Sequence, residues 1–216
     1  NEKYILVADD LAKYYLLELK TGNKLWSKKN TSPFNSEIKF YQNSFFVVDA
    51  ENTLKRISTK TGEQLWSVST EKSIIRSKKR LSIAIIDDLV IFNNTLGDIS
   101  AVNINNGSLI WQISTQGVDI YSNVHSLEMS DLIVSNNILY VSNNRNDFYS
   151  IEPKSGIINW KQRVSTNLDP LLEENYIFLL TQDGYLSVIE RLSGNLIRSS
   201  NLFKNIQTKK NQTILA

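Results

Sequence analysis

Short apolar runs recur along the chain, and polar turns separate them. The most apolar runs are Tyr4 to Ala8, Phe45 to Val48, Leu89 to Phe92, Ile138 to Val141 and Tyr176 to Leu180. Continuous apolar runs of this length indicate strands that are covered on both faces. After a short polar turn, each is followed by a second run that tends to alternate, as in Ile99 to Ile104. Alternation predicts a more peripheral strand, so each pair of runs predicts a β-hairpin.

A glycine followed four residues later by a tryptophan comes after the hairpins. The residues of this motif are Gly22 and Trp26, Gly62 and Trp66, Gly107 and Trp111, and Gly156 and Trp160, and a fifth copy has Gly194 followed by Arg198. Successive glycines are 40, 45, 49 and 38 residues apart. That period matches one blade of a β-propeller.

The repeat predicts an all-β fold, a β-propeller of four-stranded blades with about five blade units, in a single domain that spans residues 1–216. Candidates for the strand that enters a blade are Glu37 to Tyr41, Ser82 to Ile86, and Asp131 to Val134. No such strand precedes Tyr4, and residues 202–216 lead into a further strand near Thr213 to Leu215. We expect a fragment of a longer ring, and the alternative is a closed ring of five blades in which the C-terminal tail completes the first.

The tryptophans are expected to join neighbouring blades. Glycine accepts a turn conformation that a Cβ atom would penalise, and an indole ring offers a large apolar surface with one N–H donor. The alternative is an aromatic cage or a stacking platform, which requires the rings to be exposed together.

Composition and charge remove several classes of function. Lys and Arg number 24 against 22 Asp and Glu, a formal net charge of +2 in 216 residues, and no clustered basic face predicts nucleic-acid binding. The absence of cysteine excludes disulfides, a thiolate zinc site and a cysteine nucleophile. His125 is the only histidine, and the pairs Asp9-Asp10 and Asp87-Asp88 fall at turns or strand boundaries. No catalytic residue, metal or cofactor is predicted.

The glycine and tryptophan motif resembles the tryptophan-docking repeat of the PQQ-like propellers over essentially the whole chain, and within that superfamily it is most similar to the BamB family. BamB proteins are lipoproteins of the outer-membrane β-barrel assembly machinery. The resemblance implies an eight-bladed, non-enzymatic scaffold in the periplasm, at the inner face of the outer membrane of a Gram-negative bacterium. It also implies membrane association only through an N-terminal lipid anchor, which this sequence does not contain.

The loop from Lys72 to Arg80 is the first candidate partner-binding segment. Its candidate residues are Ile74, Ile75, Arg76 and Lys78. Apolar and arginine side chains supply much of the binding energy of interfaces, and the surrounding positive charge would steer an acidic partner. In BamB proteins the corresponding loop holds a leucine-arginine step that contacts BamA, and Ile75-Arg76 resembles that step. The alternative is that the isoleucines extend a strand and the lysines are simply solvated.

The loop from Gln116 to Asp131 is the second candidate, and it carries Glu128 and Asp131. BamB proteins place acidic residues of the next inter-blade loop beside the leucine-arginine step, and these two residues resemble them loosely. The alternative is that both carboxylates only keep a sheet edge soluble.

The expected function is therefore a scaffold that binds a BamA-like barrel assembly factor and assists unfolded outer-membrane protein clients. Two alternatives stay open: a PQQ-type or other small-ligand enzyme that uses the central channel, and a sensor or interaction propeller unrelated to barrel assembly. The missing cysteines argue against the quinoprotein dehydrogenases of the same superfamily, which carry adjacent cysteines.

Overall fold

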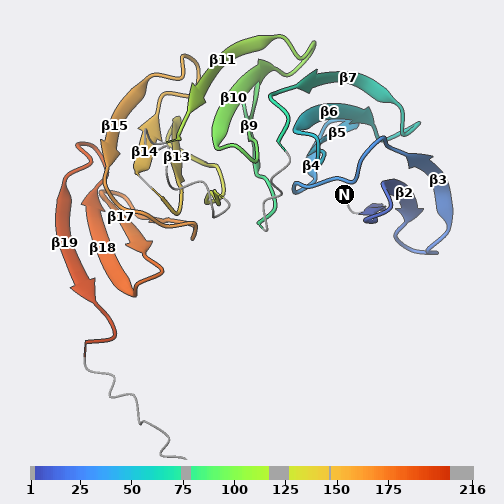
Figure 1. Ribbon diagram of the computed structural model, residues 1–216. Coiled ribbons are helices and arrows are strands. Elements are labelled where there is room, and N and C mark those ends of the chain that lie inside the picture. Colours follow the sequence, from blue (N-terminus) through green and yellow to red (C-terminus); the bar gives the residue numbers. More distant parts are fainter. Residues whose placement is uncertain (1–2, 74–78, 117–126, 146, 205–216) are drawn as a thin grey trace, which may run out of the picture.

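A computed structural model describes residues 3–73, 79–116, 127–145 and 147–204. Within these residues the chain is all-β, with five antiparallel sheets and no helix, and so no helix that could cross a membrane. The sheets stand side by side in an open arc, and the last strand of each lies on its convex side (Figure 1). In the described part of the chain, the two terminal sheets lie at opposite ends of this arc rather than closing a ring of five (Figure 1).

Each sheet is one propeller blade, in which strands that follow one another in the sequence are paired. Blade 1 consists of β1 (Tyr4–Ala8), β2 (Lys13–Glu18) and β3 (Lys24–Lys29). Blade 2 consists of β4 (Lys39–Tyr41), β5 (Ser44–Val48), β6 (Thr53–Ser58) and β7 (Gln64–Ser69). Blade 3 consists of β8 (Ile83–Ile86), β9 (Leu89–Asn93), β10 (Asp98–Asn103) and β11 (Leu109–Ser114). Blade 4 consists of β12 (Ile133–Ser135), β13 (Ile138–Ser142), β14 (Phe148–Ile151) and β15 (Ile158–Gln162), and blade 5 of β16 (Leu171–Leu172), β17 (Tyr176–Leu180), β18 (Tyr185–Glu190) and β19 (Leu196–Asn201).

The predicted propeller of four-stranded blades is confirmed for blades 2 to 5. Strands β4 and β8 fall in the segments expected to enter a blade, and β12 overlaps its expected segment but extends to Ser135. The two-residue β16 was not expected from the sequence. Blade 1 has three strands among the described residues. The segment Thr213 to Leu215 lies outside the described residues.

Strand β10 differs from its expected peripheral position. Ile99, Ser100, Ala101 and Val102 are all at most 1% exposed, although polar and apolar positions alternate along the strand. The reason is that β10 pairs with β9 on one edge and β11 on the other, while blades on either side cover both of its faces. Alternation therefore does not mark a solvent-facing surface in a stack of sheets.

The hydrophobic core is divided among the interfaces between consecutive blades. On β5, Phe45 and Val47 pack in a cluster with Tyr14 of blade 1, while Phe46 and Val48 pack in a second cluster with residues of blade 3. Successive side chains of a strand point to opposite faces, so one apolar strand serves two interfaces. This arrangement explains why the inner strands need apolar residues at nearly every position.

The glycine and tryptophan motif joins each blade to the next. The indole N–H donates to the carbonyl oxygen three residues before the next motif glycine: Trp26 to Thr59 (3.0 Å), Trp66 to Ile104 (3.2 Å), Trp111 to Pro153 (2.8 Å) and Trp160 to Arg191 (3.2 Å). The ring lies against that glycine, where a Cβ atom would come within 2.4 to 2.8 Å of ring carbons. The same glycines have φ between 70° and 76°, so both backbone conformation and space require glycine. The tryptophans are therefore spread one per interface and do not form a cage.

Four inter-blade connections lie at one end of the blades, which we call the connection end. They are the first connection (residues 30–38), the second (70–82), the third (115–132) and the fourth (163–170). Because neighbouring strands are antiparallel, each connection lies at the same end as the hairpin between the second and third strands of a four-stranded blade. The motif glycines lie at the opposite end, which we call the glycine-turn end.

Candidate partner-binding surface

The predicted partner-binding residues belong to the second and third connections. Glu128 and Asp131 are described and lie at the connection end. Ile74, Ile75, Arg76 and Lys78 lie outside the described residues, as does His125. The second connection is therefore characterised by the residues on either side of that segment, of which Lys72 and Lys79 make ion pairs.

Lys72 joins the start of the second connection to blade 2. Its ammonium group lies 2.8 Å from a carboxylate oxygen of Glu51, in the hairpin between β5 and β6. This hydrogen bond lowers the pKa of Glu51 and raises the pKa of Lys72. Both groups thus remain charged at neutral pH, although both are exposed and such a pair adds little to stability.

Lys79 joins the end of the second connection to the third and fourth connections. Its ammonium group lies 3.4 Å from Asp131 Oδ1, 3.2 Å from Asp169 Oδ1 and 3.0 Å from the carbonyl oxygen of Asn167. Asp131 also donates its backbone N–H to Asp169 Oδ1 at 2.8 Å. One cation is therefore shared by two connections that lie about 50 and 90 residues further along the chain.

Glu128 is held at both its backbone and its side chain. Its backbone N–H donates to Asn144 Oδ1, and its carbonyl accepts from the backbone N–H of Asn144, both at 3.0 Å. Its carboxylate accepts a hydrogen bond of 2.6 Å from Asn167 Nδ2. Glu128 and Asp131 thus both contact the fourth connection.

Polar contacts also join the first, second and third connections. Glu37 Oε1 accepts hydrogen bonds from the hydroxyl of Ser82 (3.2 Å) and the backbone N–H of Ile83 (3.0 Å). The Ser82 hydroxyl oxygen in turn accepts from the backbone N–H of Leu132 at 3.0 Å. Through their described residues, the first connection is therefore hydrogen-bonded to the second and the second to the third.

Buried asparagine side chains form hydrogen bonds to the second and third connections. Asn52, which is fully buried, donates to the carbonyl of Glu71 in the second connection and to the hydroxyl of Thr95, both at 2.9 Å. Asn143, also fully buried, donates to the hydroxyl of Thr115 in the third connection at 3.1 Å. Buried and satisfied amide groups hold loops in one conformation. The starts of the second and third connections, at Glu71 and Thr115, are therefore anchored to blades 2 and 4.

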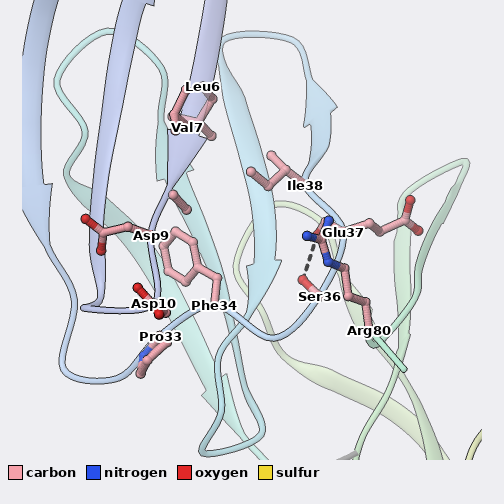
Figure 2. Close-up of a pocket in the computed structure, with 11 residues that line it drawn as sticks. Leu6, Val7, Asp9, Asp10, Pro33, Phe34, Ser36, Glu37, Ile38 and Arg80 are labelled. Carbon is pink, nitrogen blue, oxygen red and sulfur yellow. Dashed lines mark hydrogen bonds between the residues drawn. The ribbon is translucent and has the colours of Figure 1, made fainter. Parts of the chain in front are cut away.

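A pocket of about 540 Å³ lies along the inner edge of β1, between blades 1 and 2. In Figure 2, Asp9 and Asp10 lie on one side of it and Glu37 and Arg80 on the other. Strand β1 corresponds to β5, whose inner edge is paired with β4, but among the described residues β1 pairs only with β2. The pocket therefore lies beside a strand whose inner edge has no partner strand among the described residues.

Asp9, one of the acidic residues of this pocket, is held by the hairpin that follows β1. Asp9 accepts hydrogen bonds from the backbone N–H groups of Leu11 (3.0 Å) and Lys13 (2.8 Å) in the hairpin that follows β1. The hydrogen bond from Lys13 is the main cause of the lowered pKa of Asp9, so this carboxyl group stays ionised and serves the turn. Among the described residues, no three histidine or acidic side chains gather into a metal site.

The fourth connection carries no pattern that predicts a binding role. Asn167 and Asp169 contact both predicted acidic residues, but they lie in a short segment without charge clustering or a repeated motif. Lys79 lies inside the basic segment, yet no pattern pairs it with a residue 90 positions away. Only the stacking of blades brings these residues together.

The fold and its four tryptophan contacts define a class of protein, the β-propellers built from tryptophan-docking blades. The family model described as outer membrane protein assembly factor BamB matches residues 1–200, and the chain belongs to this family. Among curated relatives, the chain is similar to outer membrane protein assembly factor BamB of Moranella endobia (strain PCIT), with 22% identity over 193 residues, 88% of this chain and 50% of the relative. It spans about half or less of the length of the curated relatives that it matches.

Solved structures share the fold at low sequence identity. The crystal structure of BamB from Moraxella catarrhalis matches with a TM-score of 0.80 and 14% identity over 92% of this chain and 61% of that chain. Quinohemoprotein alcohol dehydrogenase from Comamonas testosteroni matches with a TM-score of 0.67 and 13% identity over 93% of this chain and 42% of that chain. Identities this low show the fold alone, and the fold is shared by assembly factors and by enzymes.

Proposed function

We propose that this protein is a non-enzymatic accessory factor in the assembly of outer-membrane proteins. The observation that carries the proposal is the match of the BamB family model to residues 1–200. The proposed location is the periplasmic side of the outer membrane, with a lipid anchor outside this sequence. The proposed partner is a BamA-like barrel assembly factor, and unfolded outer-membrane proteins are the proposed clients.

The second and third connections are the proposed contact with this partner, through Ile74, Ile75, Arg76, Lys78, Glu128 and Asp131. The ion pair between Lys79 and Asp131 supports the proposal, because it places the third connection directly beside the end of the second. Both loops start and end on the strands of rigid blades, and binding residues are commonly carried by loops that a rigid scaffold positions.

We also propose that further blades continue the arc on both sides. Ile5 and Val7 of blade 1 are 42% and 40% exposed, and Tyr176 and Leu180 of blade 5 are 45% and 40% exposed. In a propeller, such apolar faces are covered by the next blade. A longer ring, which the family resemblance implies to have eight blades, would also supply the missing inner strand beside β1.

The experiment that tests the proposed function is a pull-down from periplasmic and outer-membrane extract with the full-length protein. We expect the wild type to capture a barrel assembly factor and the double variant Ile75→Asp/Arg76→Glu to lose it. The matched control is Leu192→Asp/Lys20→Glu, which changes one exposed aliphatic and one exposed basic residue at the glycine-turn end. This control should capture the factor as the wild type does.

Thermal unfolding of each variant separates binding from folding. We expect the Ile75→Asp/Arg76→Glu variant to stay within about 1 kcal/mol of the wild type, as surface substitutions usually do. If the wild type captures no component of the assembly machinery, the proposed function is wrong and the propeller binds another partner.

A further inference from the structure

The fourth connection contacts both of the connections that we propose to bind the partner. It accepts two hydrogen bonds from Lys79 of the second connection, through the Asn167 carbonyl and the Asp169 carboxylate. From the third connection, Asp131 donates its backbone N–H to Asp169 and the Glu128 carboxylate accepts from Asn167. The three connections therefore form one bonded unit at the connection end.

Lys79 supplies the positive charge that lies between the carboxylates of Asp131 and Asp169. The carboxylates of Asp131 and Asp169 both lie within 3.4 Å of its ammonium group, and the Asp169 carboxylate also lies against the backbone of Asp131. The Lys79 side chain is 29% exposed and the two aspartates are 48% exposed, so neither pair alone would stabilise much. Without the lysine, however, two neighbouring negative charges would repel each other and move the third and fourth connections apart.

Among the described residues of the three connections, Leu168 is the large apolar residue that is exposed. Leu168 is 43% exposed, and its backbone N–H donates a hydrogen bond to the hydroxyl of Thr166 at 3.0 Å. Thr166 is fully buried and donates through its hydroxyl to the carbonyl of Leu180 at 2.7 Å. Leu168 is therefore presented to solvent from an ordered backbone, which lowers the entropic cost of using it in an interface.

We propose that the fourth connection is a third part of the partner-binding surface, with Leu168 as a contact residue and Lys79 as the positioning residue that holds the three connections together. This inference rests on the proposed function, because it names the same barrel assembly partner. An apolar side chain surrounded by a polar rim is the arrangement that carries binding energy in protein interfaces. Lys79 acts through Asp131 and Asp169 rather than by touching the partner.

The test measures the affinity of the full-length protein for the purified soluble region of the assembly factor by isothermal titration calorimetry. We expect Leu168→Ser and Lys79→Met each to weaken binding about tenfold, the size of effect that one interface residue typically has. Lys79→Arg keeps the positive charge and should restore binding to within about twofold of the wild type. Thermal unfolding should be unchanged in all three variants.

The matched control is Lys154→Met. Lys154 also pairs with an aspartate, Asp87, at 3.3 Å, and it is 61% exposed at the glycine-turn end. Removing this lysine should leave the affinity unchanged.

A double-mutant cycle with Asp169→Asn adds a second readout. If Lys79 acts through Asp169, the double variant Lys79→Met/Asp169→Asn should bind no more weakly than Lys79→Met.

Two results would overturn the inference in different ways. If the wild type binds, Ile75→Asp/Arg76→Glu does not, and Leu168→Ser and Lys79→Met bind like the wild type, the fourth connection is not part of the surface and the proposed function stands. If the wild type itself does not bind the assembly factor, the proposed function fails and the inference fails with it.

Discussion

The inner strands of the middle and terminal blades have similar sequences but different surroundings. In β5 of blade 2, every residue is at most 1% exposed. In β1 of blade 1, Ile5 and Val7 are about two-fifths exposed, while Leu6 and Ala8 pack in the cluster shared with blade 2. In β17 of blade 5, the covered face is the one toward the preceding blade: Ile177 and Leu179 are fully buried against blade 4. Leu180, on the other face, is exposed.

Burial in this fold is therefore supplied by the neighbouring blade rather than by the blade itself. A single four-stranded sheet has two faces and cannot cover either of them. Each interface uses alternate residues of several strands, so a blade with one neighbour leaves the apolar residues of its other face exposed. Substitutions at matched positions in middle and terminal blades can test this account directly.

The largest expected difference concerns the tryptophan position. Trp111 of blade 3 is 8% exposed and contacts Gly156 of the next blade, and Trp111→Ala should lower the free energy of unfolding by about 3 to 5 kcal/mol. Arg198 holds the same position in blade 5, where it is exposed and its Nε donates a hydrogen bond to the hydroxyl of Ser200 at 2.9 Å. Arg198→Ala should therefore change the free energy by less than about 0.5 kcal/mol in the 216-residue chain. Urea unfolding measures both.

If both variants lost a similar free energy of unfolding, the comparison would be contradicted. The side chain at this position would then stabilise its own blade rather than the contact with the next one. Binding offers an independent check. Trp111 lies on the strand that ends at the third connection but not in the partner surface, so Trp111→Ala should leave the affinity of the folded protein unchanged.

A smaller difference is expected for the motif glycines. Gly156 and Gly22 have similar φ angles of 74° and 71°, but a Cβ atom at Gly156 would lie 2.7 Å from the Trp111 ring, whereas at Gly22 it would meet nothing within 4 Å. Gly22→Ala should cost roughly 1 to 2 kcal/mol for the backbone conformation alone. Gly156→Ala should cost about 3 kcal/mol, because overpacking against the ring is added.

The double variant Gly156→Ala/Trp111→Ala checks the cause of that difference. If the ring is what the added methyl group meets, the two losses should be clearly less than additive in urea unfolding. Additive losses, or equal costs for Gly22→Ala and Gly156→Ala, would mean that contact with the tryptophan does not decide the cost.

Most of the fold could be predicted from the sequence because its information is local and repeated. The spacing of glycine and tryptophan is fixed within a single turn, and the apolar runs mark the inner strands. The burial of β10 could not be predicted, since Ser100 is polar and becomes buried only when a blade stacks on each face. Strand β16 was missed because two residues are too few to form a pattern.

The candidate surface was less predictable than the fold. The second and third connections were found from an unusual charged segment and from a family resemblance, and their contact with the partner stays a prediction. The fourth connection carries no local signal. Its link to Lys79 spans 90 residues and depends on the angle between three successive blades, which no pattern along the chain encodes.

The smallest difference is expected for two valines at the same position in adjacent blades, and it also tests the proposed longer ring. Val47 is fully buried between blades 1 and 2, whereas Val7, two residues before the corresponding hairpin, is 40% exposed. In the 216-residue chain, Val47→Ala should cost about 2 kcal/mol and Val7→Ala less than about 1 kcal/mol, because only Val47 loses buried contacts. In the full-length protein a further blade should cover Val7, and urea unfolding should then give about 2 kcal/mol for both variants. If Val7→Ala still costs less than about 1 kcal/mol there, no blade packs on that face, and the apolar residues of β1 need another explanation.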